Sequence, residues 1–369
     1  MKLKENLKYF VITGLVFLLV YIFVGIRPLK DELMMKPLWS ITLSDTVPSP
    51  EASPEMKTEG LEPFILGNRL GYFSSEGELF RSETFPQRAS VSGNLWTRYA
   101  GDSTEAILYT ATGVQSGVIE GAGFPFLDED RAYLFLPGGN GVAAYEPDGT
   151  RKWIYEGTSP IVSFSSSRSA TMLGHADGNL VYLDPDGRQQ FSFYPGGSAY
   201  PVIIGSDVSD SGSLTACVSG LEDQRFLLLR TSGEQHKVIF HTYLTGNLRR
   251  QGLVRFDSKE EYVFYEYDGG LGIVDCGGLK TSGPMTAGLK ASEIPLPGRI
   301  VSVGDSVTDN LFLVLSKLDS GYSISVFEKP DKYIASTTFD AKDAFLTYRD
   351  GCFFLGSDNA ISRINVTRR

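Results

Sequence analysis

Few side chains in this sequence have the types and the spacing that catalysis or metal binding requires. The three cysteines, Cys217, Cys276 and Cys352, form no adjacent pair and no CxxC, so they lack the spacing of a zinc site or a thioredoxin-like redox pair. Each lies in or beside an apolar run, which is typical of a buried thiol. Because a disulfide framework normally uses an even number of cysteines, we expect free thiols rather than disulfides.

The three histidines, His175, His236 and His241, do not predict a metal site. His236 and His241 are five residues apart, so they would face opposite sides of an extended strand and could not share an ion. We expect all three to be surface histidines or hydrogen-bonded ones.

The remaining candidates for chemistry are one serine motif and two acidic clusters. Gly304–Val307 (GDSV) resembles a hydrolase serine motif, but it lies between strands and lacks the strand–turn–helix context of a nucleophile. The clusters Asp128–Asp130 and Asp207…Asp210 lack the alternating ligand spacing of a calcium loop, and we interpret them as loop carboxylates. The sequence therefore predicts no catalytic, cofactor-binding or metal-ligating residue, and we expect a protein that is not an enzyme.

The composition narrows the class of partner. The formal net charge of the 369-residue chain is −10, and such a surface repels phosphate backbones, so we expect no nucleic-acid partner. The 40 glycines, 23 phenylalanines and 18 tyrosines favour strands and tight turns.

The elements that would have to position these residues are β-hairpins. The clearest runs from Asn179 to Phe193 (NLVYLDPDGRQQFSF), with alternating strands on both sides of an Asp-Gly turn at Gly187. Related hairpins are predicted over residues 69–85, 106–119, 141–155, 226–240, 271–285 and 322–339, with turns at Gly77, Gly113, Gly149 and Gly233, near Gly278, and at Pro330-Asp331. The turns recur about every 42 residues, which is the period of a propeller blade, and apolar runs between the hairpins bring each repeat to about four strands.

The period predicts an all-β fold, a β-propeller of about eight four-stranded blades, with seven blades as the alternative. We expect the propeller to occupy residues 37–369, and residues 37–43 to supply the closing strand of the last blade by pairing with Ala360–Val366. Residues 46–63 are rich in proline and glutamate and predict a solvated loop or the start of a poorly formed first strand. A stalk in this region is the alternative, and it would leave the last blade one strand short.

The segment before the propeller is long and apolar enough to cross a membrane. Tyr9–Ile26 (YFVITGLVFLLVYIFVGI) carries no charge over 18 residues. As a helix it would span about 27 Å, near the thickness of a bilayer core. We therefore expect a cytoplasmic tail at residues 1–8, a single transmembrane helix at 9–26, a short linker at 27–36, and the propeller on the periplasmic side of the inner membrane. A cleaved signal peptide is the alternative, but no A-x-A site follows the apolar run.

Two of the hairpins carry a family resemblance. Tyr145–Trp153 (YEPDGTRKW) and Tyr182–Phe191 (YLDPDGRQQF) resemble the repeat of pyrroloquinoline-quinone-like propellers, in which a tryptophan follows four residues after the turn glycine. Here Trp153 stands four residues after Gly149, and Phe191 stands four after Gly187. The pattern covers most of residues 64–369, and the WD40 variant fits less well because no Gly-His…Trp-Asp pairing is present.

The resemblance implies an eight-bladed propeller and two kinds of relative, the quinoprotein dehydrogenases and the cofactor-free scaffold of the outer-membrane β-barrel assembly machinery. The dehydrogenases use a vicinal cysteine pair and calcium ligands on a much longer chain. This sequence has no adjacent cysteines, so it departs from the dehydrogenases, and we expect no cofactor. The scaffold relative fits better in size, although it is held by a lipid rather than by a helix.

The sequence therefore predicts a membrane-anchored scaffold that binds envelope or membrane proteins through its rim or loops, with a role in envelope assembly. The alternative is a sensor or carrier that binds a small ligand, such as a sugar or cell-wall fragment, at the central channel. Aromatic and acidic residues converging at one channel mouth would favour that alternative. An enzyme is the third hypothesis, because propeller loops can host catalysis that a sequence does not reveal.

Overall fold

The structure, a computed structural model, describes residues 13–18, 33–43, 58, 60–280 and 289–368. Residues 37–364 form one compact unit, which is the propeller, and residues 1–36 together with 365–369 are assigned to a second unit. The predicted tail at 1–8 lies outside the described residues, as do residues 9–12 and 19–26 of the predicted transmembrane segment and residues 27–32 of the linker. Residues 13–18 are helical, and within the described ranges no helix is long and apolar enough to cross a membrane.

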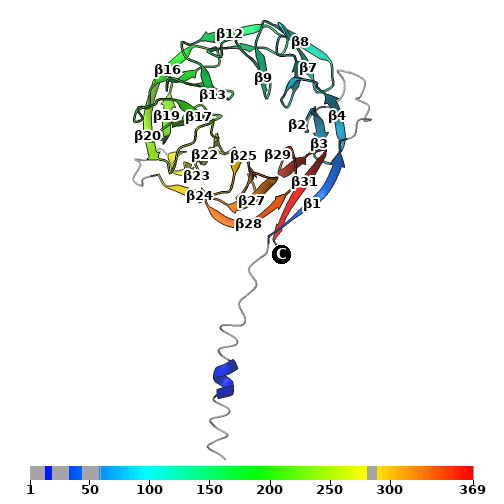
Figure 1. The fold of residues 1–369 in the computed structure, drawn as a ribbon, viewed down its shortest axis with the longest axis vertical. Coiled ribbons are helices and arrows are strands. Elements are labelled where there is room, and N and C mark those ends of the chain that lie inside the picture. The colour runs from blue at the N-terminus through cyan, green and yellow to red at the C-terminus, as the bar shows by residue number, and fades with distance from the viewer. Residues whose placement is uncertain (1–12, 19–32, 44–57, 59, 281–288, 369) are drawn as a thin grey trace, which may run out of the picture. The chain divides into compact units, whose positions relative to one another are not determined.

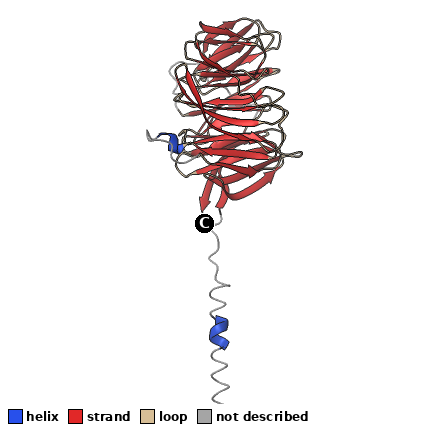
Figure 2. Ribbon diagram, turned by 90° about the vertical axis from the view of Figure 1, so that its left-hand side faces the viewer, coloured by secondary structure: helices blue, strands red, loops and turns tan. Residues whose placement is uncertain are grey.

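The propeller consists of eight antiparallel sheets arranged around a central axis, as Figure 1 shows and as the edge-on view of Figure 2 supports. In the described part of the chain, seven sheets have four strands and one has three, so the eight-bladed prediction is confirmed and the seven-bladed alternative is wrong. The blades are numbered in chain order: blade 1 is β2–β4, blades 2 to 7 take four consecutive strands each from β5 to β28, and blade 8 is β29–β31 with β1. The strands are β1 (Leu33–Thr42), β2 (Leu61–Leu66), β3 (Arg69–Ser74), β4 (Leu79–Thr84), β5 (Arg88–Val91), β6 (Leu95–Tyr99), β7 (Glu105–Thr110), β8 (Gln115–Glu120), β9 (Phe124–Asp128), β10 (Arg131–Phe135), β11 (Gly141–Tyr145), β12 (Arg151–Glu156), β13 (Ile161–Ser166), β14 (Thr171–His175), β15 (Leu180–Leu183), β16 (Gln189–Phe193), β17 (Ile203–Val208), β18 (Leu214–Ser219), β19 (Arg225–Ser232), β20 (Gln235–Tyr243), β21 (Val254–Phe256), β22 (Tyr262–Tyr267), β23 (Gly270–Asp275), β24 (Ala291–Pro295), β25 (Arg299–Asp305), β26 (Leu311–Lys317), β27 (Tyr322–Glu328), β28 (Lys332–Phe339), β29 (Ala344–Arg349), β30 (Cys352–Ser357) and β31 (Ala360–Arg368).

The burial of each strand follows from its place in the blade. Middle strands such as β15 and β18 are buried along their whole length, because neighbouring blades cover both faces of the sheet. Outer strands such as β12 and β20 mix buried or half-buried positions with exposed ones. The continuous apolar runs and the alternating runs of the sequence therefore mark different positions in one repeating unit.

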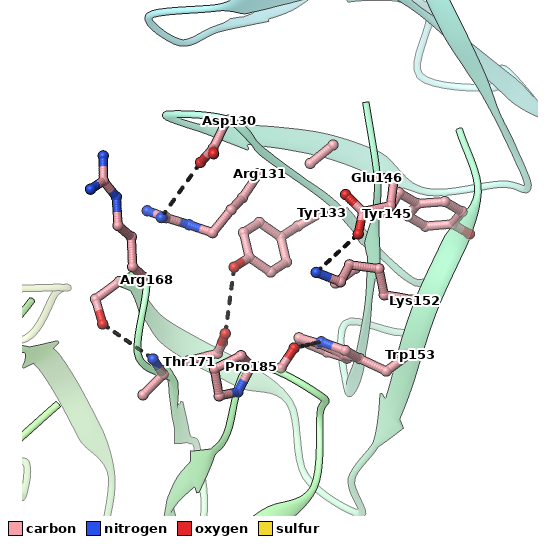
Figure 3. Close-up of a pocket in the computed structure, with 14 residues that line it drawn as sticks. Asp130, Arg131, Tyr133, Tyr145, Glu146, Lys152, Trp153, Arg168, Thr171 and Pro185 are labelled. Atoms are coloured by element: carbon pink, nitrogen blue, oxygen red, sulfur yellow. Dashed lines mark hydrogen bonds and ion pairs between the residues drawn. The ribbon is translucent and has the colours of Figure 1, made fainter. Parts of the chain in front are cut away.

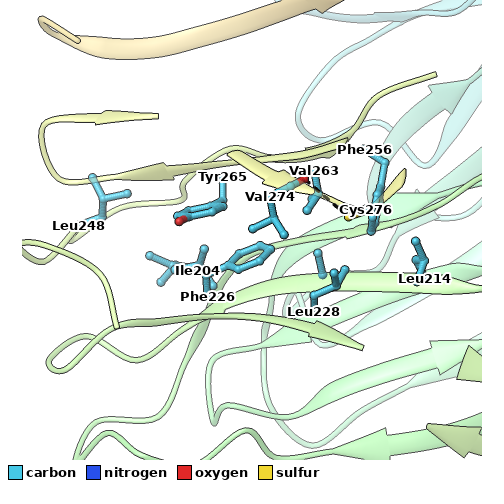
Figure 4. Close-up of a cluster of buried hydrophobic side chains, with 12 residues drawn as sticks. Ile204, Leu214, Phe226, Leu228, Leu248, Phe256, Val263, Tyr265, Val274 and Cys276 are labelled. Carbon is cyan, nitrogen blue, oxygen red and sulfur yellow. Dashed lines mark hydrogen bonds between the residues drawn. The ribbon is translucent and has the colours of Figure 1, made fainter. Parts of the chain in front are cut away.

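The core lies between blades rather than in one centre. The cluster between blades 5 and 6 is the largest example, and Figure 4 shows side chains from both blades meeting in it. Phe226 of β19 stacks on Tyr265 of β22 with ring centroids 4.1 Å apart, and Val218 and Val274 are fully buried beside them. Truncating a buried aromatic of this kind typically costs about 3–5 kcal/mol.

Tryptophans of outer strands dock onto the next blade. Trp153 of β12 donates its indole N–H to the carbonyl oxygen of Pro185 (3.2 Å), in the β15–β16 turn of blade 4. Trp39 of β1 donates in the same way to Ser75 (3.0 Å), in the β3–β4 turn of blade 1. The turn glycine, Gly187, has a positive φ, and a Cβ added to it would meet the Trp153 ring at 2.3 Å. Gly187 is therefore needed both for its own turn and for the docking of Trp153.

The ring is closed by strands from both ends of the chain. Blade 8 has the order β1-β31-β30-β29, so its outermost strand comes from the N-terminal side, as the Pro37–Leu43 segment led us to expect. Ser362 of β31 donates to Ser40 of β1 (3.0 Å, between hydroxyl oxygens). The strand β1 begins at Leu33, so residues 33–36 are not linker. Leu61–Pro63 belong to β2, so the end of the 46–63 segment starts a strand, as the second interpretation predicted, rather than a loop; residues 46–57 and 59 lie outside the described residues.

Six of the seven predicted hairpins are present with the predicted turns, and the seventh has a longer connection than predicted, of which residues 281–288 lie outside the described residues. Instead of turning near Gly278, the chain after β23 forms a short 3-10 helix (Gly277–Lys280), and β23 pairs with β24. The carboxylate of Asp275 accepts a hydrogen bond from the Gly277 N–H (2.9 Å), which turns the chain out of the sheet before a second strand can start.

The antiparallel strand order divides the connections between two faces of the propeller. Within a blade, the turns after the first and third strands lie on one face, which we call the hairpin face; the Gly187 turn is an example. Turns after the second strand and connections between blades, such as residues 194–202, lie on the other, which we call the connection face.

Candidate functional site

The three cysteines are buried in or beside strands, and none of them lines the cavities described below. All three are free and buried, as predicted. Burial raises the pKa of the Cys217 and Cys276 thiols to about 12, so their thiolate form is strongly disfavoured. Burial also raises the pKa of the Cys352 thiol above its ordinary value.

His175 is hydrogen-bonded and His241 is exposed, as expected, but the Nδ1 of the half-buried His236 has no hydrogen-bond partner among the described residues, and the reason given for excluding a shared ion was wrong. His175 is buried, with Nδ1 2.7 Å from the Ser159 carbonyl oxygen and Nε2 3.2 Å from the Tyr155 hydroxyl. His236 and His241 pair with residues of β19 four positions apart, because a bulge at Ile239 shifts the register, so both face the same side of the sheet. They are about 13 Å apart along the strand, too far to share an ion.

The Gly304–Val307 segment is not organised as a nucleophile. Ser306 is buried, and its hydroxyl lies 3.2 Å from the Tyr348 hydroxyl and accepts a hydrogen bond from the Asp309 N–H (3.1 Å). Its remaining partners are the Thr308 hydroxyl and the Asp309 carboxylate, so no histidine is among the described residues that bond this serine. The hydroxyl shapes the turn after β25.

The acidic residues come together more than the sequence suggested. The innermost strands of blades 3 to 6 end on the hairpin face around a cavity of about 540 Å³ in the central channel. Three phenylalanines line it, and one of them, Phe126, is 40% exposed. The acidic side chains that line it are Asp128, Glu129, Asp207, Asp210 and Asp257. In the described part of the chain, no three His, Cys, Asp or Glu residues group as metal ligands.

Several of these carboxylates tie one blade to the next. Asp128 accepts hydrogen bonds from Arg131 (2.7 Å) and from the hydroxyl of Ser166 in blade 4. Asp207 was predicted to be a loop residue, but it belongs to β17. Its carboxylate accepts hydrogen bonds from the Ser165 hydroxyl and from the Phe256 N–H (2.7 Å). Desolvation raises the pKa of Asp207 to about 6 despite these donors.

A buried lysine joins blades 6 and 7. The Lys329 ammonium lies 2.8 Å from the Asp257 carboxylate and 3.8 Å from that of Asp305. The exposed fractions of the three side chains are 4%, 0% and 5%, so this cluster is part of the propeller interior.

The connection face carries a group of exposed apolar side chains. Tyr194 and Tyr200 lie between β16 and β17, Leu221 lies between β18 and β19, and Tyr243 ends β20. Their exposed fractions are 59%, 55%, 39% and 58%. We call these four residues the tyrosine patch.

Hydrogen bonds fix the segments of the tyrosine patch around Arg225. The Leu221 N–H donates to the Tyr200 carbonyl oxygen (3.1 Å). The Arg225 guanidinium donates to the carbonyl oxygen of Pro195 (2.5 Å) and lies 5.7 Å from the centre of the Tyr243 ring. These contacts join three chain segments into one surface, which sequence reasoning missed. The paired tyrosines of the Gly/Ser-rich segment YPGGSAY were the available signal.

The comparisons with known proteins agree with this fold. A family model described as a β-propeller protein matches residues 1–368. The chain belongs to this β-propeller family. An uncharacterized protein of Treponema pallidum (strain Nichols) is 33% identical over 371 residues, covering 99% of this chain and 96% of that protein.

Two solved propellers share the fold of this family member at low identity. The crystal structure of BamB from Moraxella catarrhalis superposes with a TM-score of 0.57 at 14% identity, covering 90% of this chain and 100% of that one. The computationally designed Ika8 protein superposes with a TM-score of 0.57 at 13% identity, covering 86% of this chain and 99% of that one. At such identities the likeness concerns the fold alone.

Proposed function

We propose that this protein is a non-enzymatic platform that binds a protein partner through the tyrosine patch of its connection face. The proposal rests on three tyrosines that are 55% to 59% exposed on segments fixed by hydrogen bonds. Tyrosine and arginine are enriched at the centres of protein interfaces, because they bury a large area and keep a polar tip. A surface that is already fixed loses little conformational freedom on binding.

We propose further that the propeller lies on the periplasmic side of the inner membrane and acts in envelope assembly. Support comes from the uncharged Tyr9–Ile26 segment and from the resemblance of the repeat to the cofactor-free scaffold of the outer-membrane assembly machinery. The docking of Trp39 and Trp153 on turn glycines supports a pyrroloquinoline-quinone-like repeat without the cofactor.

The partner proposal is tested by capture with matched variants. Purified full-length protein is cross-linked in solubilised envelope, and the captured partner is quantified for Tyr200→Ser/Tyr243→Ser and for Tyr333→Ser. Tyr333 lies on β28 and is as exposed as Tyr243, at 58%, which makes it a matched control. Loss of the two patch rings should lower capture by about tenfold or more, and the control should not. Equal capture by all forms would contradict the proposal.

The location is tested by membrane extraction and protease access. The full chain should stay with the membrane after a carbonate wash and be digested in spheroplasts but not in intact cells. Deletion of residues 1–26 should release the propeller to the soluble fraction. Release of the intact chain by carbonate would contradict the anchor.

A second candidate function is binding of a sugar or cell-wall fragment in the channel cavity. It is favoured by the convergence of phenylalanines and carboxylates around about 540 Å³ at one channel mouth. Carboxylates accept hydrogen bonds from sugar hydroxyls, and an exposed ring such as Phe126 can stack on a sugar face. Calorimetry with N-acetylglucosamine oligomers should show binding that Phe126→Ala weakens and that Tyr243→Ser leaves unchanged. The reverse pattern, or no binding, would exclude this candidate.

A further inference from the structure

A second cavity lies on the hairpin face, between blades 3 and 4, as Figure 3 shows. Its volume is about 200 Å³, which equals roughly seven water molecules. Small side chains leave this space open, since Ala132, Ala144 and Ala170 line it where larger residues would fill it. The cavity is separate from the tyrosine patch, which lies on the opposite face.

The charges around this cavity are paired except at one arginine. Three cations line it, Arg131, Lys152 and Arg168. Lys152 pairs with Glu146 at 3.1 Å, and Arg131 pairs with Asp128 at 2.7 Å and lies 3.9 Å from Asp130. Arg168 is exposed, and its side chain has no hydrogen bond or ion pair with any residue that the structure describes. A chain with a net charge of −10 thus presents an unneutralised arginine at this point.

Arg131 adds a donor without an acceptor. One terminal nitrogen of its guanidinium donates to Asp128 (2.7 Å), while its buried Nε–H has no acceptor among the described residues. The hydroxyls of Tyr133 and Thr171 are 3.5 Å apart across the cavity, so at least one can donate to a further group. The hydroxyl pair can therefore donate to an acceptor in the cavity, whereas the Arg131 Nε–H has no exposed surface there.

The opposite wall of the cavity is aromatic. Trp153 and Tyr145 line it, and the indole of Trp153 is held by its hydrogen bond to the carbonyl oxygen of Pro185 (3.2 Å). A fixed aromatic wall facing arginine donors suits a ligand with a carboxylate at one end and a short apolar or aromatic group at the other.

We propose that this cavity binds a small apolar carboxylate, with its oxygens at the Arg168 guanidinium and the hydroxyls of Tyr133 and Thr171, and its apolar part against Trp153 and Tyr145. The same chemistry is offered by a free carboxylic acid and by the terminal carboxylate of a polypeptide. The proposal does not depend on the partner proposed for the tyrosine patch.

The probes are benzoate and benzamide, which have nearly the same shape and differ in charge. Titration calorimetry of the full-length protein should detect benzoate, and benzamide should bind at least about tenfold more weakly, because it lacks the charge that pairs with arginine. Added salt should weaken the binding of benzoate only.

Two arginine variants separate the cavity from general surface charge. Arg168→Gln should weaken benzoate binding about tenfold or more. Arg188→Gln is the matched control, because Arg188 lies in the β15–β16 turn of the same blade, is 77% exposed and should not affect binding. Circular dichroism and thermal midpoints confirm that both variants fold. Equal binding of the two probes, full binding by Arg168→Gln, or no heat at about 10 mM benzoate would overturn the proposal.

A second pair of probes identifies the source of the carboxylate. Acetyl-glycyl-phenylalanine carries a polypeptide terminus, and its amide lacks the charge. If the peptide acid binds more tightly than benzoate and its amide does not bind, the site takes a chain terminus. If benzoate binds more tightly than the peptide acid, the site takes a free acid.

Discussion

Two interfaces at the hairpin face differ in how their charged side chains are paired. One lies between blades 3 and 4, and the other lies between blades 6 and 7. Between blades 6 and 7, Lys329 of the β27–β28 turn fills the space and is neutralised by Asp257 and Asp305. Between blades 3 and 4, the matching β15–β16 turn brings Pro185, and a cavity is left beside Arg131 and Arg168. The first interface satisfies its charges internally, and the second does not.

The difference distinguishes charges that serve the structure of the propeller from charges that are available to a ligand, in a fold whose repeats look alike. A charge that is buried and paired stabilises only the propeller, because solvent and ligands cannot reach it. A cation that is exposed and unpaired costs little to keep and remains available to a ligand. The carboxylates of Glu62 and Asp207 are intermediate between a buried, paired charge and an exposed, unpaired one. Variants of all these residues therefore test the comparison.

The largest effect is expected for Lys329→Met. The change leaves Asp257, whose side chain is fully buried, without its cation at 2.8 Å. Removing one partner of a buried pair typically costs about 3–5 kcal/mol. Denaturant unfolding of the variant should therefore show a large loss of stability.

The double variant Lys329→Met/Asp257→Asn shows whether the unpaired charge is the cause. It should recover part of the stability lost in Lys329→Met, because the buried charge is gone. If the two changes simply add, the lysine acts through packing rather than through charge.

The next effect is the pH dependence caused by Glu62 of β2. Glu62 is buried, and its cation, Arg349, is 3.5 Å away and 39% exposed, so burial raises the pKa of Glu62 from 4.5 to about 7. The folded protein thus holds this proton more tightly than the unfolded chain, and the stabilisation is complete below about pH 4.5 and lost as the pH rises through 7.

Glu62→Gln isolates this contribution. Between pH 5 and pH 8, the unfolding free energy of the natural protein should fall by about 2 kcal/mol relative to the variant. Urea unfolding of both proteins at the two pH values measures it. Parallel pH profiles would show that Arg349 keeps Glu62 ionised throughout.

A smaller effect of the same sign is expected for Asp207. Its two oxygens accept from neutral donors, Ser165 and the Phe256 N–H, and burial raises its pKa from 3.8 to about 6. Its folded pKa is above its unfolded one, so stability is lost as the pH rises toward 6 and beyond. Because Asp207 lines the channel cavity and is only partly buried, we expect about 1 kcal/mol relative to Asp207→Asn between pH 4 and pH 7. An unfolding series that shows no change would place the carboxylate in contact with water.

What the sequence predicted well is local. At Gly187, the carboxylate of Asp184 accepts from the N–H groups of Asp186 (3.0 Å) and Arg188 (2.9 Å), so residues within five positions determine the turn. Such turns repeat along the chain, and their spacing gives the number of blades. The predicted turn near Gly278 is wrong because the Asp275 side chain makes a similar local bond where the chain enters a 3-10 helix, and β23 pairs with the later strand β24.

What the sequence could not predict is long-range. The face of His236 and His241 depends on a bulge at Ile239, which nothing in the local composition marks. The tyrosine patch and the blade 3–4 cavity join residues that are about thirty or more positions apart, such as Arg225 with Pro195 and Arg131 with Arg168. Only the stacking of blades brings them together.

The smallest effect on stability is expected for Arg168→Gln, and it completes the comparison with Lys329→Met. Because the Arg168 side chain is exposed and unpaired among the described residues, its loss should change the unfolding free energy by less than about 0.5 kcal/mol. A loss of stability like that of Lys329→Met would mean that Arg168 belongs to the structural charges of the propeller. Neutral stability together with lost benzoate binding would show that charges at the hairpin face serve the structure between blades 6 and 7 and a ligand between blades 3 and 4.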